Sequence, residues 1–269
     1  MPPGGTVLVA GATGGVGQLT VAYLLAQGFS VSALVRDQAK ARQLFASSST
    51  DSARLRLVVA DTRQPASLAT CCGDIDAVIC ATGTTAFPSA RWAGDNGPQQ
   101  TDAVGVANLV SAVLAQQTRP GRLRRFVIVS SVGVKRQMTM PFLLLNLGGV
   151  LTAKAEGEAT VMRSGLEWTI LRPGRLTDGP YTSYDLNTLL KATSGTRRRP
   201  QLALDDTLLP QESSRLVVAS AAVAALRSDA AVGKAFDVGS TEGTGPDADG
   251  DPVRWQSEWD ALFAGARRA

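Results

Sequence analysis

The 269-residue chain is long enough for one full α/β domain and short for two. Its 44% hydrophobic and 19% charged residues are ordinary for a folded protein. It has no histidine, which excludes Ser–His–Asp catalysis, Cys–His catalysis and histidine-ligated metal sites. The net charge of +4 suits an anionic small molecule, but with aromatic residues at only 5% it does not indicate nucleic acid as a partner.

Cysteine usage and the apolar runs indicate the class of protein. The three cysteines, Cys71, Cys72 and Cys80, fit a reduced interior better than a disulfide framework. The N-terminus lacks the charged and apolar regions of a secretory signal. The longest apolar run, 141–151, falls well short of the roughly 20 residues that a membrane span needs. We predict no membrane span and, from these features alone, a cytoplasmic protein.

Short apolar runs alternate along the chain with longer segments of helical periodicity. The expected strands are Thr6–Ala10, Ser30–Arg36, Leu55–Ala60, Ala77–Ala81, Arg125–Ser130, Glu167–Leu171 and Lys234–Val238. The expected helices are Gly15–Gln27, Asp37–Phe45, Pro65–Cys72, Thr101–Gln117, Val150–Ser164, Ser213–Arg227 and Trp255–Ala264. This alternation predicts an α/β fold with a doubly wound parallel sheet, the Rossmann fold. We expect one domain over 1–269, with 175–214 and 240–269 forming a smaller substrate or lid region.

The first strand runs directly into the glycine-rich segment 11–17, GATGGVG, which opens the first helix. Gly11 permits a tight turn, Gly14 lets backbone N–H groups approach a pyrophosphate, and Gly17 lets the helix pack close to the sheet. A glycine-rich turn that binds nothing is the alternative. The position between strand and helix, with a second strand about 20 residues further on, favours a dinucleotide site. The predicted contacts are Gly11, Thr13, Gly14, Gly15, Val16 and Gly17.

The residue that ends the second strand indicates which dinucleotide is bound. NAD sites place Asp or Glu there to hold the ribose 2′-hydroxyl group, whereas this chain has Arg36, with Lys40 and Arg42 close by. A guanidinium group can pair with a 2′-phosphate, which a carboxylate would repel. Arg36 could instead be the first solvated residue after the strand, and Asp37 could turn toward the site. We predict NADP as the cofactor.

Six segments together resemble the atypical short-chain dehydrogenase/reductases. They are VLVAGATGGVG at 7–17, SVSALVR at 30–36, VVAD at 58–61, VICATG at 78–83, FVIVSSVGV at 126–134 and TILRPGRLTDGPY at 169–181. Within this group the chain is similar to the NmrA-like NAD(P)-binding proteins of plants, algae and cyanobacteria. The resemblance covers residues from about 6 to 240. It implies an oxidoreductase fold with NADP and a location in the chloroplast.

The resemblance also implies roles for residues that follow the later strands. Asp61 would bind the adenine amino group, and Lys154 would hydrogen-bond the nicotinamide ribose. The other implied cofactor contacts are Thr62 near the adenine, Ala81, Thr82 and Gly83 on the ribose and pyrophosphate side, and Ser130, Ser131, Pro173 and Gly174 around the nicotinamide.

The chain departs from the family pattern at the catalytic acid. Family members place a tyrosine four residues before the lysine as proton donor, but Val150 stands there, and Asp102 occupies the place of a frequent asparagine. The remaining catalytic candidates are Lys154, Ser130, Ser131 and Tyr181. Tyr181 or the nearby Tyr184, Lys154 itself or a water molecule could supply the proton. We expect Glu156 and Glu158 to be solvated charges.

Two functions follow from these features. The first is an NADPH-dependent reductase acting on a small-molecule substrate. The second is a non-enzymatic NADP(H)-binding scaffold, assembly factor or redox sensor that docks on a protein complex. The second function predicts an intact phosphate loop without a catalytic tyrosine. Similarity of fold alone does not decide between the two functions.

Overall fold

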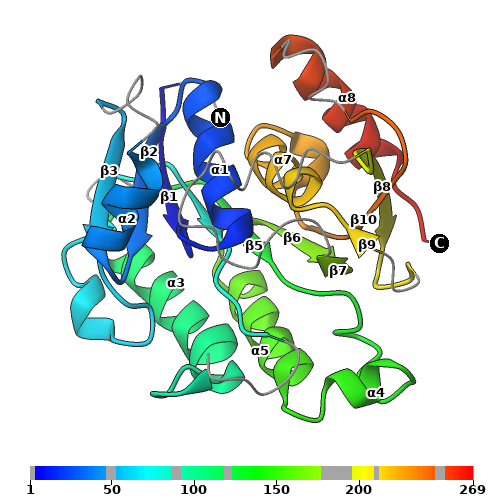
Figure 1. Ribbon diagram of the computed structural model, residues 1–269, viewed down its shortest axis with the longest axis horizontal. Helices are drawn as coiled ribbons and strands as arrows, with labels where there is room; N and C mark the ends of the chain where they lie inside the picture. The colour runs from blue at the N-terminus through cyan, green and yellow to red at the C-terminus, as the bar shows by residue number, and fades with distance from the viewer. Residues whose placement is uncertain are drawn as a thin grey trace.

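The computed structural model describes residues 4–46, 53–85, 92–117, 123–176, 196–208, 212–245 and 252–268. Eight strands form one sheet in the order β3-β2-β1-β4-β5-β6-β10-β8 (Figure 1). Their bounds are β1 Thr6–Ala10, β2 Ser30–Val35, β3 Leu55–Val59, β4 Ala77–Cys80, β5 Arg125–Val129, β6 Glu167–Pro173, β8 Arg199–Leu204 and β10 Lys234–Thr241. All neighbouring strands are parallel except β8, which runs antiparallel to β10. This confirms the predicted doubly wound sheet.

Helices cover both faces of the sheet (Figure 1). The bounds are α1 Gly15–Ala26, α2 Gln38–Phe45, η2 Pro65–Leu68, η4 Gln99–Val104, α3 Gly105–Ala115, α4 Phe142–Leu145, α5 Val150–Met162, α7 Arg215–Ala225, η5 Asp229–Ala231 and α8 Pro252–Gly265. Side chains of α1, α2, α7 and α8 form one apolar core with the sheet, and those of α3 and α5 form the other. Among the described residues, none of the helices combines the length and the apolar character that a membrane span requires.

Alternation along the central strands supplies both cores at once. In β1, Val7 and Val9 belong to the core under α1 and α7, while Leu8 and Ala10 belong to the core under α3. Successive side chains of a strand point to opposite faces, so a strand buried on both sides must be apolar throughout. The strand order reverses between β1 and β4, and a doubly wound sheet binds its ligand beyond the carboxyl ends of the strands at this point.

The structure corrects several element bounds. The expected helix Pro65–Cys72 is only the short 3₁₀ turn η2, Pro65–Leu68. The expected helix Thr101–Gln117 begins earlier, as the π-helical turn η4, and then continues as α3. The edge strand β8 was not predicted. A two-stranded pair, β7 (Arg175–Leu176) with β9 (Glu212–Ser213), lies outside the main sheet.

The proposed lid region is described only in part. Residues 177–195, which include Tyr181 and Tyr184, lie outside the described ranges. The subdivision of the chain into a cofactor part and a smaller substrate part therefore stays a prediction.

Candidate cofactor site

The glycine-rich turn between β1 and α1 lies against the end of β4. Gly11 has a φ of +77°, and a Cβ atom at this position would lie 2.6 Å from the carbonyl oxygen of Ala81. A Cβ atom at Gly17 would overlap the carbonyl group of Gly11. Any side chain at either position would therefore displace backbone, which accounts for both glycines.

The first turn of α1 faces this glycine cradle. Gly14 caps the helix without a side-chain hydrogen bond, so no side chain of the cap competes for the helix N-terminus. The N–H groups of a first helical turn have no carbonyl partner within the helix, and the helix dipole adds positive potential. Gly15, Val16 and Gly17 are the residues of this turn. The arrangement fits a pyrophosphate group, so the cradle and the implied dinucleotide agree.

At the adenosine end, Arg36 follows β2 and is exposed. Its Nη1 atom donates to Asn96 Oδ1 at 3.0 Å. Asp37 accepts a hydrogen bond from the backbone N–H group of Lys40 at 3.0 Å and so caps α2. In the structure, Asp37 therefore caps α2 and does not turn toward the predicted ribose position.

Asp61, which follows β3, is already paired. Arg63 Nε donates to Asp61 Oδ1 at 3.0 Å, and Arg63 Nη2 donates to Asp61 Oδ2 at 2.6 Å. Arg63 lowers the pKa of Asp61 through these hydrogen bonds. The resemblance implies that Asp61 binds the adenine amino group, but both oxygens of this carboxylate already accept hydrogen bonds from Arg63. Thr62 beside it is buried, and its carbonyl oxygen accepts from Asn108 Nδ2 at 2.9 Å.

At the nicotinamide end, Lys154 on α5 reaches the segment that follows β4. Lys154 Nζ donates to Asp102 Oδ1 at 2.7 Å, and only 11% of its side chain is exposed. Asp102 Oδ2 accepts from the backbone N–H group and the hydroxyl group of Thr84, at 3.1 and 2.6 Å. A Cβ atom at Gly83 would lie 3.1 Å from Lys154 Nζ. Gly83 and Lys154, predicted from distant parts of the chain, are thus brought together.

The two serines after β5 differ in their environment. The hydroxyl group of Ser130 is buried and has no hydrogen-bond partner among the described residues. Ser131 donates to the carbonyl oxygen of Val132 at 3.0 Å. A buried hydroxyl group without a partner is costly unless water or a ligand supplies one. Ser130 therefore fits a position facing a bound group, whereas Ser131 is satisfied locally.

The remaining predicted residues lie along the same edge. Thr82 Oγ1 lies 3.2 Å from Cys80 Sγ. Pro173 ends β6, and the Gly174 N–H group donates to Ser213 Oγ at 2.8 Å. Tyr181 lies outside the described ranges, so the structure does not test it as a proton donor.

Beside the site lies a group of buried charged side chains that was not predicted from the sequence. Arg172 of β6 forms two hydrogen bonds with Glu158 of α5, at 2.9 and 2.7 Å, and both side chains are buried. The expectation that Glu158 is a solvated charge is therefore wrong, while Glu156 is exposed as expected. Asp237 of β10 pairs in register with Arg172, and burial raises its pKa. The sequence feature that could have revealed this buried pair is Arg172, a charged residue inside a mostly apolar strand.

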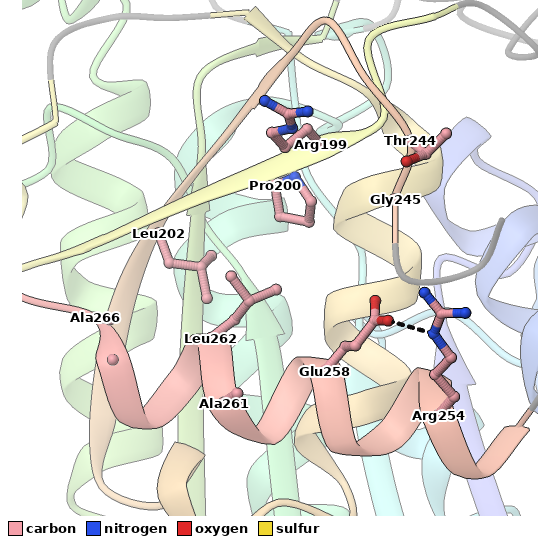
Figure 2. A pocket seen from close by; sticks show the side chains of 11 residues that line it. Arg199, Pro200, Leu202, Thr244, Gly245, Arg254, Glu258, Ala261, Leu262 and Ala266 are labelled. Carbon is pink, nitrogen blue, oxygen red and sulfur yellow. Dashed lines mark hydrogen bonds and ion pairs between the residues drawn. The ribbon is translucent and has the colours of Figure 1, made fainter.

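The cavity of about 580 Å³ between β8 and α8 is a separate feature. Figure 2 shows Arg254 and Glu258 of α8 joined at one end of it, with Pro200 and Leu202 of β8 across from the helix. None of the predicted cofactor residues lines this cavity. It lies at the β8 edge of the sheet, which β5, β6 and β10 separate from β4.

Comparisons with known proteins identify the family of the chain. The model of a family described as NAD(P)H-binding matches residues 11–229. An uncharacterised chloroplastic protein of Arabidopsis thaliana is 36% identical over 224 residues, which cover 82% of this chain and 71% of that protein. Protein TIC 62, chloroplastic, of the same plant is 33% identical over 229 residues, covering 79% of this chain but only 32% of that protein.

Solved structures support the fold. A putative NAD-dependent epimerase/dehydratase of Bacillus halodurans superposes with a TM-score of 0.65 at 22% identity, covering 90% of this chain and 96% of that one. A short-chain dehydrogenase/reductase of Veillonella parvula in complex with NADP gives a TM-score of 0.62 at 17% identity, covering 87% and 94%. With the glycine cradle in place and the family model matched over residues 11–229, this chain belongs to the NAD(P)H-binding family of Rossmann-fold proteins.

Proposed function

We propose that the chain is an NADPH-dependent reductase that works without the tyrosine of the short-chain family. Two observations carry the proposal: the buried hydroxyl group of Ser130, just after β5, has no partner among the described residues, and the ammonium group of Lys154 is held against Gly83, just after the neighbouring β4. Bound NADPH would supply a hydride to an acceptor there. Other parts of the same edge supply the pyrophosphate cradle and Arg36.

Lys154 and Asp102 have complementary roles in this proposal. Lys154 holds the nicotinamide ribose, and Asp102 fixes the position and balances the charge of the ammonium group at 2.7 Å. In the resembled family, the lysine charge lowers the pKa of the tyrosine. Here Val150 fills that position as a buried apolar residue, so a free positive charge would have nothing to activate.

The acceptor class follows from the absent acid. Ser130 can donate a hydrogen bond to a carbonyl oxygen, but a serine hydroxyl group is a poor proton donor. Quinone-type acceptors delocalise the negative charge that hydride addition leaves, and they take their proton from solvent more readily than simple ketones. We therefore propose a quinone or another conjugated carbonyl compound as substrate class.

A second candidate is an NADP(H)-responsive docking protein without turnover. It is favoured by an apolar surface on the segment before α5, where Met138 is 81% exposed, Leu147 77% and Met140 65%. Exposed apolar side chains that gather in one segment often mark a protein-binding surface. The chloroplastic relatives suggest that either function operates in the chloroplast.

The experiment is a turnover assay that follows NADPH oxidation with a quinone and, separately, with a simple ketone. We expect the quinone to be reduced faster. Ser130→Ala should lower kcat by about tenfold, the effect of one lost hydrogen bond in the transition state. Ser131→Ala is the matched control and should change little, because its hydroxyl group bonds to the neighbouring carbonyl group.

The docking alternative predicts a different outcome. Tight NADPH binding without oxidation by any acceptor would exclude the reductase. Turnover that is equal in wild type and Ser130→Ala would leave the reductase but remove the role of Ser130.

A further inference from the structure

Two arginines from neighbouring strands converge on one short segment at the adenosine end. Arg36 follows β2 and Arg63 follows β3, and β2 pairs with β3 up to Val35 and Val59. Arg63 Nη1 donates to the Gly94 carbonyl oxygen at 2.8 Å, and Arg36 Nη1 donates to Asn96 Oδ1 at 3.0 Å. Gly94 and Asn96 are two residues apart, at most ~7 Å even in an extended chain.

The two arginines donate to neutral acceptors on this segment, where an anion would compete. Asp61 is paired with Arg63, and both Arg63 and Arg36 lower its pKa, so both positive charges act on the same small region. Asp95 of the same segment also attracts Arg63 through its charge, but the atoms that accept hydrogen bonds from the two arginines there belong to Gly94 and Asn96. The acceptors on the 94–96 segment are a neutral carbonyl group and a neutral amide group. A phosphate forms stronger, charge-assisted hydrogen bonds and would compete with both.

We propose that Arg63 is the second residue that binds the 2′-phosphate of NADP(H), together with Arg36. This rests on the proposed binding of NADP(H). Arg63 is 18% exposed in its side chain and is held in place by Asp61 and Gly94. A fixed, mostly buried guanidinium group loses less entropy on binding and is less screened than an exposed one such as Arg36.

The assignment gives Asp61 a different role from the one that the resemblance implies. Its two carboxylate oxygens are engaged by Arg63 at 3.0 and 2.6 Å. Asp61 is thus a positioning residue, which aligns Arg63 and keeps it extended toward the ribose. The adenine base would be contacted by neighbouring groups such as Thr62 and not by a free carboxylate.

The experiment is calorimetric titration of the full chain with NADPH and with NADH. Arg63→Ala should weaken NADPH binding by at least about tenfold, the loss of one charge-assisted hydrogen-bond partner. NADH affinity should stay within about threefold, because NADH carries no 2′-phosphate for Arg63 to contact. Arg63→Lys keeps the charge but not the planar fork and should fall between the two. Arg56→Ala is the control, since it removes the same charge from β3, where Arg56 bonds to Ser32.

Arg63→Ala also frees Asp61, whose charge could repel the phosphate by itself. The double variant Asp61→Asn/Arg63→Ala removes that carboxylate and separates the two effects. If Arg63 binds the phosphate, the preference for NADPH over NADH should be about tenfold lower in the double variant than in the single variant Asp61→Asn. If selectivity returns in the double variant, Arg63 only neutralises Asp61 and the proposal is overturned.

Other outcomes separate this inference from the proposed function. Wild-type protein that binds neither nucleotide would refute NADP(H) binding itself. Wild type that prefers NADPH, with a preference that Arg63→Ala and Arg63→Lys both retain, would refute only the role of Arg63. A thermal melt of each variant without nucleotide identifies any that do not fold, and Arg63→Lys preserves the ion pair with Asp61 in that case.

Discussion

The pyrophosphate cradle and the predicted nicotinamide end of the cofactor site are built in different ways. At the pyrophosphate cradle, backbone shapes the site, since a Cβ atom at Gly11 or Gly17 would overlap neighbouring backbone. At the predicted nicotinamide end, three side chains from distant segments form the proposed site: Asp102, Ser130 and Lys154. Backbone geometry resists substitution, whereas a set of side chains can change one by one. The chain accordingly keeps the glycine cradle, and its departure from the pattern that the resemblance implies, Val150 in place of a tyrosine, lies among the side chains.

The two departures at the nicotinamide end are physically consistent with each other. Val150 removes the tyrosine, and Asp102 places a carboxylate 2.7 Å from the lysine. The lysine charge is thereby balanced where no tyrosine is left to activate. A single departure would leave either an unbalanced buried charge or a tyrosine without its activating lysine.

The largest effect is expected at the cradle. Gly17→Ala should weaken NADPH binding by about 100-fold, equivalent to ~3 kcal/mol, because the new Cβ atom overlaps the Gly11 carbonyl group and displaces the turn. Calorimetric titration measures the effect. Gly265→Ala is the control, since a Cβ atom there meets nothing within 4 Å. Near-normal affinity in Gly17→Ala would mean that the cradle does not hold the nucleotide.

At the nicotinamide end, the expected effect on stability is somewhat smaller. Asp102→Asn should lower the free energy of unfolding by about 2 kcal/mol, because Lys154 loses its counter-ion in a largely buried position. Denaturant titration measures the change. Asp205→Asn removes an exposed carboxylate that pairs with Lys135 and Arg268, and should cost less than about 1 kcal/mol. Equal effects of both variants would show that the Lys154–Asp102 pair is not special.

Arg36→Ala tests the selectivity of the adenosine end. We expect NADPH affinity to fall by about tenfold while NADH affinity changes little, because only NADPH carries a phosphate for the guanidinium group. Arg42→Ala, on the exposed side of α2, removes an equal charge and should have a smaller effect. Equal losses for both nucleotides would assign Arg36 a structural role.

The smallest effect is a pH dependence at Asp61. Arg63 lowers the pKa of Asp61 in the folded protein. A carboxyl group with a lowered pKa stabilises the fold above its unfolded pKa, and this contribution is lost as the pH falls through the lowered value. Asp61→Asn should therefore cost about 1 kcal/mol near pH 7 and progressively less toward acid. A cost that does not vary with pH would contradict the ion pair.

The fold and the cradle could be predicted from sequence because their signals are local. The alternation within β1 and the glycines at 11, 14 and 17 each specify a geometry within a few residues. Lys154 was reached through the family resemblance, and its proximity to Gly83 follows from strand order. The short turn η2 was overestimated as a helix, since apolar spacing over eight residues does not distinguish the two.

Paired charges were what the sequence could not resolve. Glu158 looks like a solvated helix residue until Arg172 of β6 is placed beside it. Arg125, a charged residue at the start of β5, is buried and contacts Glu167 and the carbonyl group of Ser228. Asp61 and Arg63 are close in sequence, yet their pairing depends on side-chain direction. Burial of a charge depends on a partner that tertiary packing supplies, so periodicity alone does not reveal it.

Titration of the unaltered protein with NADPH and NADH, in one buffer at low salt, tests the account most directly. The intact cradle and the two arginines at the adenosine end predict that NADPH binds at least about tenfold more tightly than NADH. Equal affinities would contradict the proposed contacts of Arg36 and Arg63 with the 2′-phosphate. The absence of binding by either nucleotide would contradict the cofactor site as a whole.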